Sequence, residues 1–146
     1  LHVGAAGTTV FVVTSTGSVG IGTTNPTETL QVQGNVSINN TTSYGSVTSI
    51  GSTTVAIDIH SGLSTSTYRS VEYTIQATQG TNYHSTKILA LHNGTTAYHS
   101  EYGTIYNNTS VATYDVDVSG GNIRLLATGA SASSTNYVIN FVATKI

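Results

Sequence analysis

The chain has 146 residues, a formal net charge of −2 and only 7% charged residues, against roughly 25% in ordinary soluble domains. Its four Lys and Arg residues form no basic patch, which argues against nucleic-acid binding. It has no cysteine, which excludes disulfides and thiolate metal sites. No apolar run approaches the length of a membrane span, so we expect no membrane insertion.

The N-terminal third is predicted to form short strands separated by turns. Residues 10–14 are a β-prone run, and Val19 and Ile21 alternate with glycines, which permit close approach of backbones. Asn25-Pro26 favours a turn, and residues 27–29 are expected to make one helical turn after the proline. No piece is long enough to bury its own apolar side chains. We therefore expect identical copies of the chain to supply the missing neighbours.

The chain opens within a repeat of this unit. Leu1-His2-Val3-Gly4 matches Leu30-Gln31-Val32-Gln33-Gly34, and a short apolar strand follows each segment. Fixed periods of this size are typical of stacked architectures. The sequence therefore predicts a longer protein, whose missing N-terminal part would contact other proteins.

A polar segment follows the repeat. Residues 39–54 contain three isolated apolar positions, Tyr44, Val47 and Ile50, and we expect them to form a neck or linker. The predicted organisation is a shaft over residues 1–38, this linker over residues 39–54, and a C-terminal β-domain over residues 55–146.

The C-terminal part is predicted to be an antiparallel β-sandwich of the jelly-roll kind. Short strands recur at regular spacing without a helical period, and Asn93-Gly94 is a strong hairpin signal. Residues 87–91 are apolar on both faces, so this strand is expected to be central or covered by a partner chain. Strands are expected over residues 55–60, 70–77, 87–91, 97–106, 113–118, 123–128 and 137–143.

The sequence offers little sign of catalytic or metal chemistry. The five histidines form no His-x-His pair, and we expect no metal and no cofactor. Two pairs share one strand face each, Asp58 with His60 and Asp115 with Asp117, but a solvated polar face is the simpler interpretation. A glycosidase would need two carboxylates flanking a sugar. The candidates, by residue type only, are Glu72, Glu101, Asp115 and Asp117.

Aromatic residues give the candidate ligand-binding set. Tyr98, Tyr102 and Tyr106, with His99 between them, lie on or beside one predicted strand. Tyrosine combines a large apolar contact area with a hydroxyl group, which suits recognition of a glycan or a protein. Packing between strands or chains is the competing interpretation, because tyrosine is favoured in strands in any case.

Residues 19–38, with their Gly-Ile-Gly-Thr strand, Asn-Pro turn and Val-Gln-Gly-Asn-Val segment, resemble the shaft repeat of tail-fibre and related virion proteins of tailed bacteriophages. Segments 68–76, 87–94, 101–105 and 123–128 resemble terminal domains of virion proteins, especially those of cyanobacterial phages. The resemblance implies an intertwined parallel homotrimer wound about one axis. Its core would contain Val19, Ile21, Leu30, Val32, Val36 and Ile38.

The resulting expectation is a non-enzymatic structural protein of a phage virion, a tail fibre or spike whose terminal β-domain contacts the host surface. Its partners would be two sister chains, other virion proteins and a host glycan or protein. Three alternatives stay open: a glycan-binding adhesin tip, a subunit of a bacterial or environmental surface filament, and an enzyme acting on surface polysaccharide.

Overall fold

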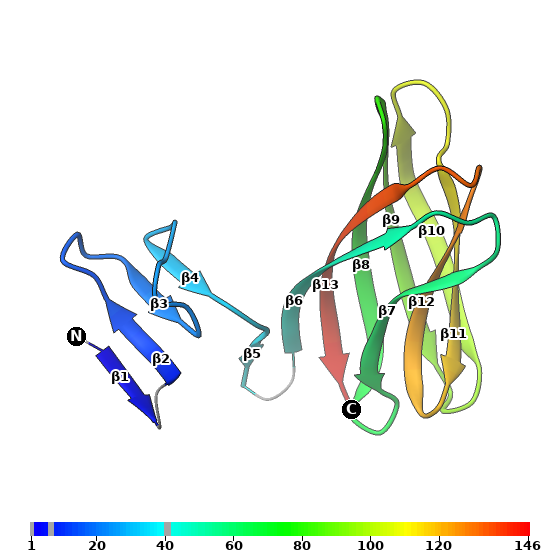
Figure 1. Ribbon diagram of the computed structural model, residues 1–146. Coiled ribbons are helices and arrows are strands. Elements are labelled where there is room, and N and C mark those ends of the chain that lie inside the picture. The colour runs from blue at the N-terminus through cyan, green and yellow to red at the C-terminus, as the bar shows by residue number, and fades with distance from the viewer. Residues whose placement is uncertain (1, 6–7, 40–41) are drawn as a thin grey trace. The chain divides into compact units, whose positions relative to one another are not determined.

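The structure is a computed structural model that describes residues 2–5, 8–39 and 42–146. The regular elements of these residues are β-strands, so the all-β prediction is confirmed (Figure 1). The chain forms two compact units, residues 1–36 and residues 37–146. In the described part of the chain, no helix is long and apolar enough to cross a membrane.

The N-terminal unit is a four-stranded sheet in the order β1-β2-β3-β4. Neighbouring strands are antiparallel except for β3 and β4, which run parallel. Gly20 of β3 shows why this sheet needs glycine, because a Cβ atom there would lie 2.5 Å from the backbone oxygen of Thr23. The strands are β1 (His2–Ala5), β2 (Thr8–Val13), β3 (Val19–Ile21) and β4 (Leu30–Val32).

The predicted helical turn over residues 27–29 is not formed, and these residues make a bend that leads into β4. The side chain of Gln31 explains the difference. Its Oε1 atom accepts a hydrogen bond from the backbone N–H of Thr27 at 2.8 Å. A side chain thus satisfies a donor that would have been free at the start of a helix.

Six side chains were expected to form the core of a multi-chain shaft, and none of them is buried within the single chain. Val19 and Val32 are half-buried. The other four are exposed: Leu30 by 62%, Ile38 by 51%, and Ile21 and Val36 by 41% each. This segment therefore presents an apolar surface that its own fold leaves uncovered.

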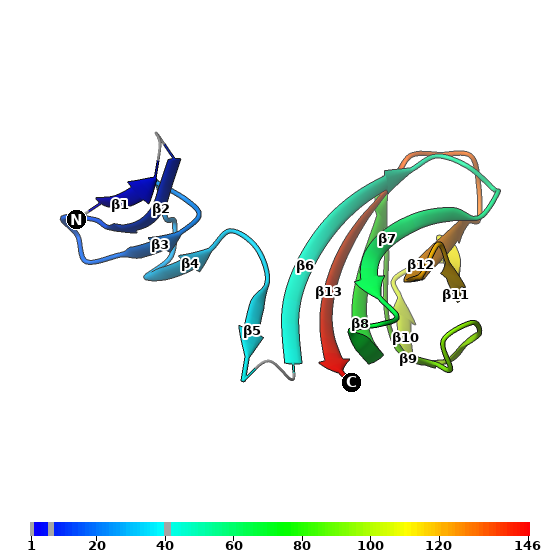
Figure 2. The same ribbon diagram turned by 90° about the horizontal axis from the view of Figure 1, so that it is seen from below.

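The C-terminal unit contains two sheets (Figures 1 and 2). The larger has the strand order β10-β9-β8-β13-β6-β5, and the smaller has the order β11-β12-β7. The larger sheet consists of β5 (Val36–Ile38), β6 (Thr42–Gly51), β8 (Tyr68–Gln79), β9 (Asn82–His92), β10 (Ala97–Tyr106) and β13 (Thr135–Lys145). The smaller consists of β7 (Ile57–Ser64), β11 (Ala112–Ser119) and β12 (Asn122–Gly129).

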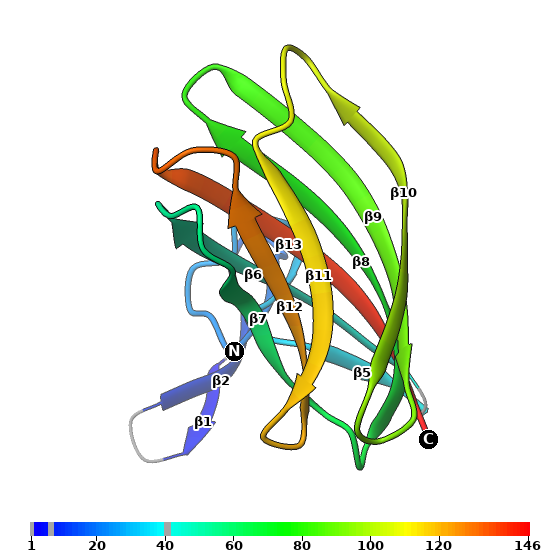
Figure 3. The same ribbon diagram turned by 90° about the vertical axis from the view of Figure 1, so that its right-hand side faces the viewer.

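The two sheets face one another and enclose one hydrophobic core (Figure 3). Strict alternation on β8 sends Val71, Tyr73, Ile75 and Ala77 inward, as the sequence predicts. The long strands β13 and β9 add Ile139 and Ile88 from the same sheet, and β12 adds Leu125 and Ile123 from the other. A sandwich is therefore established, whereas the finer jelly-roll connectivity stays a prediction.

The expected linker over residues 39–54 contains a strand of the large sheet. Strand β6 pairs with β13 along its whole length, and the compact C-terminal unit begins at Ser37. The physical reason is a weak alternation of inward- and outward-facing side chains along β6. This alternation is hard to see in the sequence because most of these residues are polar. Ser43 is buried, and Val47 packs against the hydrophobic core.

Candidate binding surface

The outer face of β9 and β10 carries large apolar side chains that the fold leaves exposed. On β9, Ile88 and Ala90 point into the core, whereas the alternating Leu89 and Leu91 are each 51% exposed. The pairing of Tyr98 with Leu91 places this tyrosine on the same outer face. We define the β9–β10 outer face by its six large side chains: Tyr83, Leu89, Leu91, Tyr98, Tyr102 and Ile105.

The predicted hairpin at Asn93-Gly94 is confirmed, and its turn holds the end of this face in place. Gly94 has a φ of 111°, a left-handed conformation that favours glycine. The Oδ1 atom of Asn93 accepts backbone hydrogen bonds from Thr95 at 3.1 Å and Thr96 at 2.9 Å. Its Nδ2 atom donates to the hydroxyl of Tyr98 at 3.3 Å, so the turn also orients this tyrosine.

A buried histidine secures the same turn from inside. The Nδ1 atom of His92 accepts a hydrogen bond from the N–H of Gly94 at 2.9 Å. The proton must therefore lie on Nε2, which donates to the carbonyl of Tyr68 at 2.6 Å. Arg69 adds a bond from its guanidinium to the His92 carbonyl at 3.0 Å. His92 is thus a structural residue.

The charges on this face neutralise one another. The Nζ atom of Lys87 lies 2.8 Å from Oε1 of Glu72. The ammonium group of Lys87 lowers the pKa of Glu72, and a hydrogen bond from the Tyr102 hydroxyl lowers it further. The same pairing raises the pKa of Lys87. The face therefore carries a compact ion pair with no excess charge.

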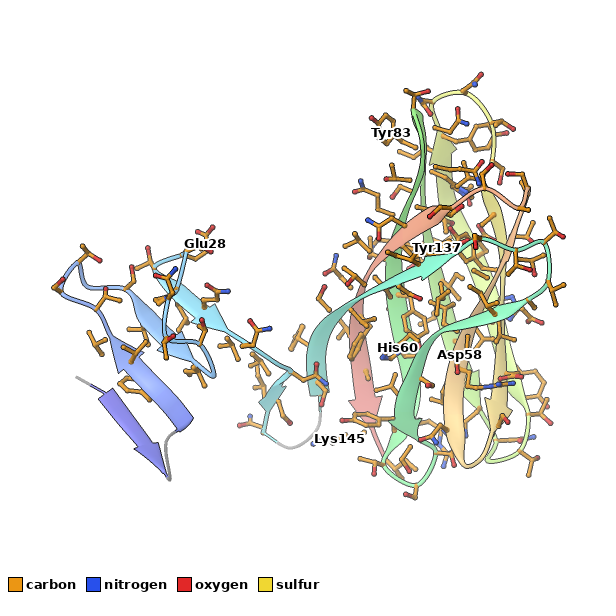
Figure 4. The ribbon with its side chains drawn as sticks, in the orientation of Figure 1. Glu28, Asp58, His60, Tyr83, Tyr137 and Lys145 are labelled. Carbon is orange, nitrogen blue, oxygen red and sulfur yellow. The ribbon has the colours of Figure 1, made fainter. Side chains whose placement is uncertain are left out.

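Two shallow hollows lie along the β9–β10 pair. The first, of about 220 Å³, is lined by Leu89, Leu91, Tyr98 and neighbouring residues. The second, of about 340 Å³, is lined by residues that include Tyr83 and Ile105. Tyr83 lies at the end of the long β8–β9 hairpin (Figure 4). Both hollows are mainly apolar.

The structure divides the four predicted ligand-binding residues between two faces of β10. Tyr98 and Tyr102 belong to the outer face, through their pairs Leu91 and Lys87. His99 points the other way, with Nδ1 3.7 Å from Oδ1 of Asp115. Tyr106 also lies on the inner face, because a β-bulge precedes it.

The register of β10 against β9 shifts between Tyr102 and Ile105, where Gly103 has a φ of 66°. This bulge inserts one extra residue. Ile105 consequently takes the outward place, and Tyr106 turns inward to meet the ring of His84 edge-on, with centroids 5.9 Å apart. The four predicted residues therefore do not form one site.

A polar cluster lies behind β10, on the inner face of the sheet. The buried hydroxyl of Thr86 donates to Oε1 of Glu101 at 2.9 Å. Beside it, His84 is 2% exposed, and its Nε2 atom has no hydrogen-bond partner among the described residues. Burial lowers the pKa of His84, although the charge of Glu101 opposes this. Burial also raises the pKa of the neighbouring Tyr114, whose hydroxyl likewise lacks a partner among those residues.

The carboxylates considered for a glycosidase do not all lie on one face, although Asp115 lies beside His99, which is on the same face of β10 as Glu101. Glu72 lies on the outer face of the large sheet, whereas Glu101 lies on its inner face. On β11, Asp117 is held by Arg124 of β12, with Nε 2.8 Å from Oδ1. In the described part of the chain, no group of three or more His, Cys, Asp or Glu residues could hold a metal ion.

The sequence-based set missed the residues that complete the outer face. Leu89 and Leu91 were recognisable, because residues 87–91 are apolar on both faces. Tyr83 and Ile105 were not, since their direction depends on the hairpin register and on the bulge.

Comparisons with known proteins show which solved structures this fold resembles. No family model matches the chain, and no curated protein matches it. The tailspike protein of the Acinetobacter phage vB_ApiP_P1 is similar in structure, with a TM-score of 0.51 and 16% identity over 85% of this chain and 26% of that one. This chain thus spans about a quarter of that protein.

Two further tailspikes are more distant. That of Acinetobacter baumannii phage AM24 has a TM-score of 0.47 and 8% identity, over 73% of this chain and 27% of its own. The tailspike gp49 of Acinetobacter baumannii bacteriophage Fri1, described as a capsular polysaccharide depolymerase, has a TM-score of 0.44 and 11% identity, over 77% and 21%. The fold of this chain is therefore distantly similar to part of a phage tailspike.

Proposed function

We propose that this chain is a structural, non-enzymatic part of a phage appendage, a tail fibre or spike on the virion. The likeness to part of a tailspike supports this proposal, and so does the shaft-like motif of residues 19–38. The separation of Glu72 and Glu101 onto opposite faces of the sheet supports the non-enzymatic part.

The observation that carries the proposal is the uncovered apolar surface of the leading segment. Leu30 is 62% exposed and Ile21 is 41% exposed in a unit made of very short strands. Such side chains gain roughly 25 cal/mol for each Å² of apolar surface removed from water. Three parallel copies wound about one axis would remove this surface and form an intertwined homotrimeric shaft.

The terminal sandwich would then be the part that contacts the host surface. With few charges, its surface offers hydroxyl and amide groups, which suit a host glycan or protein. The chain would also contact other virion proteins. A glycan-binding adhesin tip is the second candidate, favoured by the two exposed tyrosines Tyr98 and Tyr102 on one face.

Solution mass tests the proposal. Multi-angle light scattering and native mass spectrometry should give three times the chain mass of 15.1 kDa. In SDS gel electrophoresis, an unheated sample should migrate more slowly than the monomer. A clean monomer would contradict the proposal, whereas open-ended polymers would favour a surface filament, because heterologous contacts that do not close produce filaments.

Host contact is measured separately. Fluorescently labelled protein should bind intact host cells, and the same label on an unrelated β-sandwich provides the control. Release of reducing sugar from capsular polysaccharide, lost in Glu72→Gln, would overturn the non-enzymatic assignment.

A further inference from the structure

The β9–β10 outer face carries six exposed large side chains, and Tyr44, Ile50 and Val142 on β6 and β13 are exposed on the same side of the sheet. A sheet with one face on a core normally presents polar side chains on the other face. Strand β8 does so with Thr74 and Gln76. Strands β9 and β10 instead present six large side chains, each between 41% and 69% exposed. Groups of exposed apolar side chains mark interaction sites, whereas singly scattered residues do not.

The ion pair and two of the three tyrosine hydroxyls of this face already have bonding partners. Lys87 and Glu72 form an ion pair at 2.8 Å, and the hydroxyl of Tyr102 joins it. The hydroxyl of Tyr98 is bonded to Asn93. A glycan would need free donors and acceptors for its own hydroxyl groups. Leucines and tyrosines with few unpaired charges are instead typical of the core of a protein–protein interface.

The chain itself supplies the partner for this face. The leading segment exposes Ile21 and Leu30, and the strand β5 that directly follows it belongs to the large sheet. Once the leading segments associate, the attached sandwiches are held at an effective concentration in the millimolar range for short connections. A modest apolar face then suffices to bring copies of the sandwich together. Association of the leading segments has already met much of the cost in translational and rotational entropy.

We propose that the β9–β10 outer face is the surface through which the sandwich packs against sister copies in the trimer. Three copies of this face would meet about the symmetry axis, with Leu89, Leu91 and Tyr98 at the centre of each contact. This inference rests on the proposed homotrimer and adds the surface that holds its terminal domain.

Cysteine labelling of the full chain tests the assignment, because the chain contains no cysteine of its own. The probe is Leu91→Cys, and the matched control is Thr113→Cys, an exposed position on β11 of the other sheet. In particles of confirmed trimeric mass, a maleimide should react with Leu91→Cys at least about tenfold more slowly, because reaction requires opening of the contact. Both variants should react equally fast in urea.

A charge placed in the contact gives a second measurement. Leu89→Lys should dissociate the trimer at a lower SDS or urea concentration than wild type, whereas Thr113→Lys should not. Circular dichroism should show the strands retained in both variants, since Leu89 is half exposed within one chain.

The possible outcomes distinguish the proposed packing surface from the proposed homotrimer. Equal labelling rates in a trimer, with Leu89→Lys as resistant as wild type, would overturn this inference and leave the trimer intact. Such a result would identify the face as a free surface for an external ligand such as a glycan. A monomeric wild-type chain would overturn the proposed function together with this inference.

Discussion

A half-buried histidine, His60, and a fully buried one, His84, show how the fold treats a titratable ring packed among aromatic side chains. The ring centroid of His60, a residue labelled in Figure 4, lies 4.7 Å from that of Phe141, and the Nδ1 atom of His60 lies 3.3 Å from the Tyr73 hydroxyl. Burial lowers the pKa of His60, although the charge of Asp58 opposes this. Burial lowers the pKa of His84 in the same way. Both rings are therefore held in the neutral form by the fold.

This arrangement predicts an acid-sensitive fold. The unfolded chain binds a proton near the ordinary histidine pKa of about 6.5, whereas the folded chain resists it. Stability should therefore be full above that pH and fall as the pH drops toward the lower pKa of the folded state. Urea unfolding followed by tyrosine fluorescence between pH 7.5 and pH 5 measures the effect.

The matched variant carries both substitutions, His60→Gln and His84→Gln. It should be less stable than wild type at pH 7.5, because buried contacts are lost, but should show a shallower decline toward pH 5. An identical pH slope in the double variant would contradict the role of these two rings.

At the scale of the element, the bulge of β10 decides which side chains form a surface. Regular alternation would place Tyr98, Tyr102 and Tyr106 on one face, since they are spaced by even numbers of residues. The bulge at Gly103 reverses this alternation and replaces Tyr106 by Ile105 on the outer face. One backbone conformation thus changes the chemistry of the whole strand.

The bulge predicts a graded response to substitution. Gly103 has a φ of 66° and open space around the position of a Cβ atom, so its backbone angle is the constraint. Gly103→Ala should lower the free energy of unfolding by about 1–2 kcal/mol, the cost of a left-handed conformation for an L-residue. Gly103→Asn should lower it less, because asparagine tolerates this region better. Urea unfolding midpoints measure both, and equal effects of Ala and Asn would argue against backbone strain.

At the scale of the whole molecule, the shortage of charge sets how copies of the chain would associate. Only 7% of the residues are charged, and among the described residues the ion pairs include Lys87 with Glu72 and Arg124 with Asp117. Contacts between copies would therefore be apolar or hydrogen-bonded. Salt screens charges but does not weaken the burial of apolar surface.

The predicted consequence is a salt-resistant oligomer. The mass in light scattering should be the same at low salt and at about 1 M NaCl, where the Debye length falls to about 3 Å. Apolar association should instead respond to urea, which solvates apolar and peptide groups. Dissociation by salt alone would contradict an apolar interface and would point to charge pairing between copies.

Local sequence pattern was enough to predict the all-β class, the strand alternation and the hairpin at Asn93-Gly94, because these depend on neighbouring residues along the chain. It also showed that residues 87–91 are apolar on both faces. Contacts between distant parts of the chain were needed to show that β6 belongs to the sheet and that Gln31 replaces a helical turn at Thr27. The same holds for the inward turn of Tyr106, because register and side-chain bonding are fixed by partners distant in the chain, where local pattern carries no information.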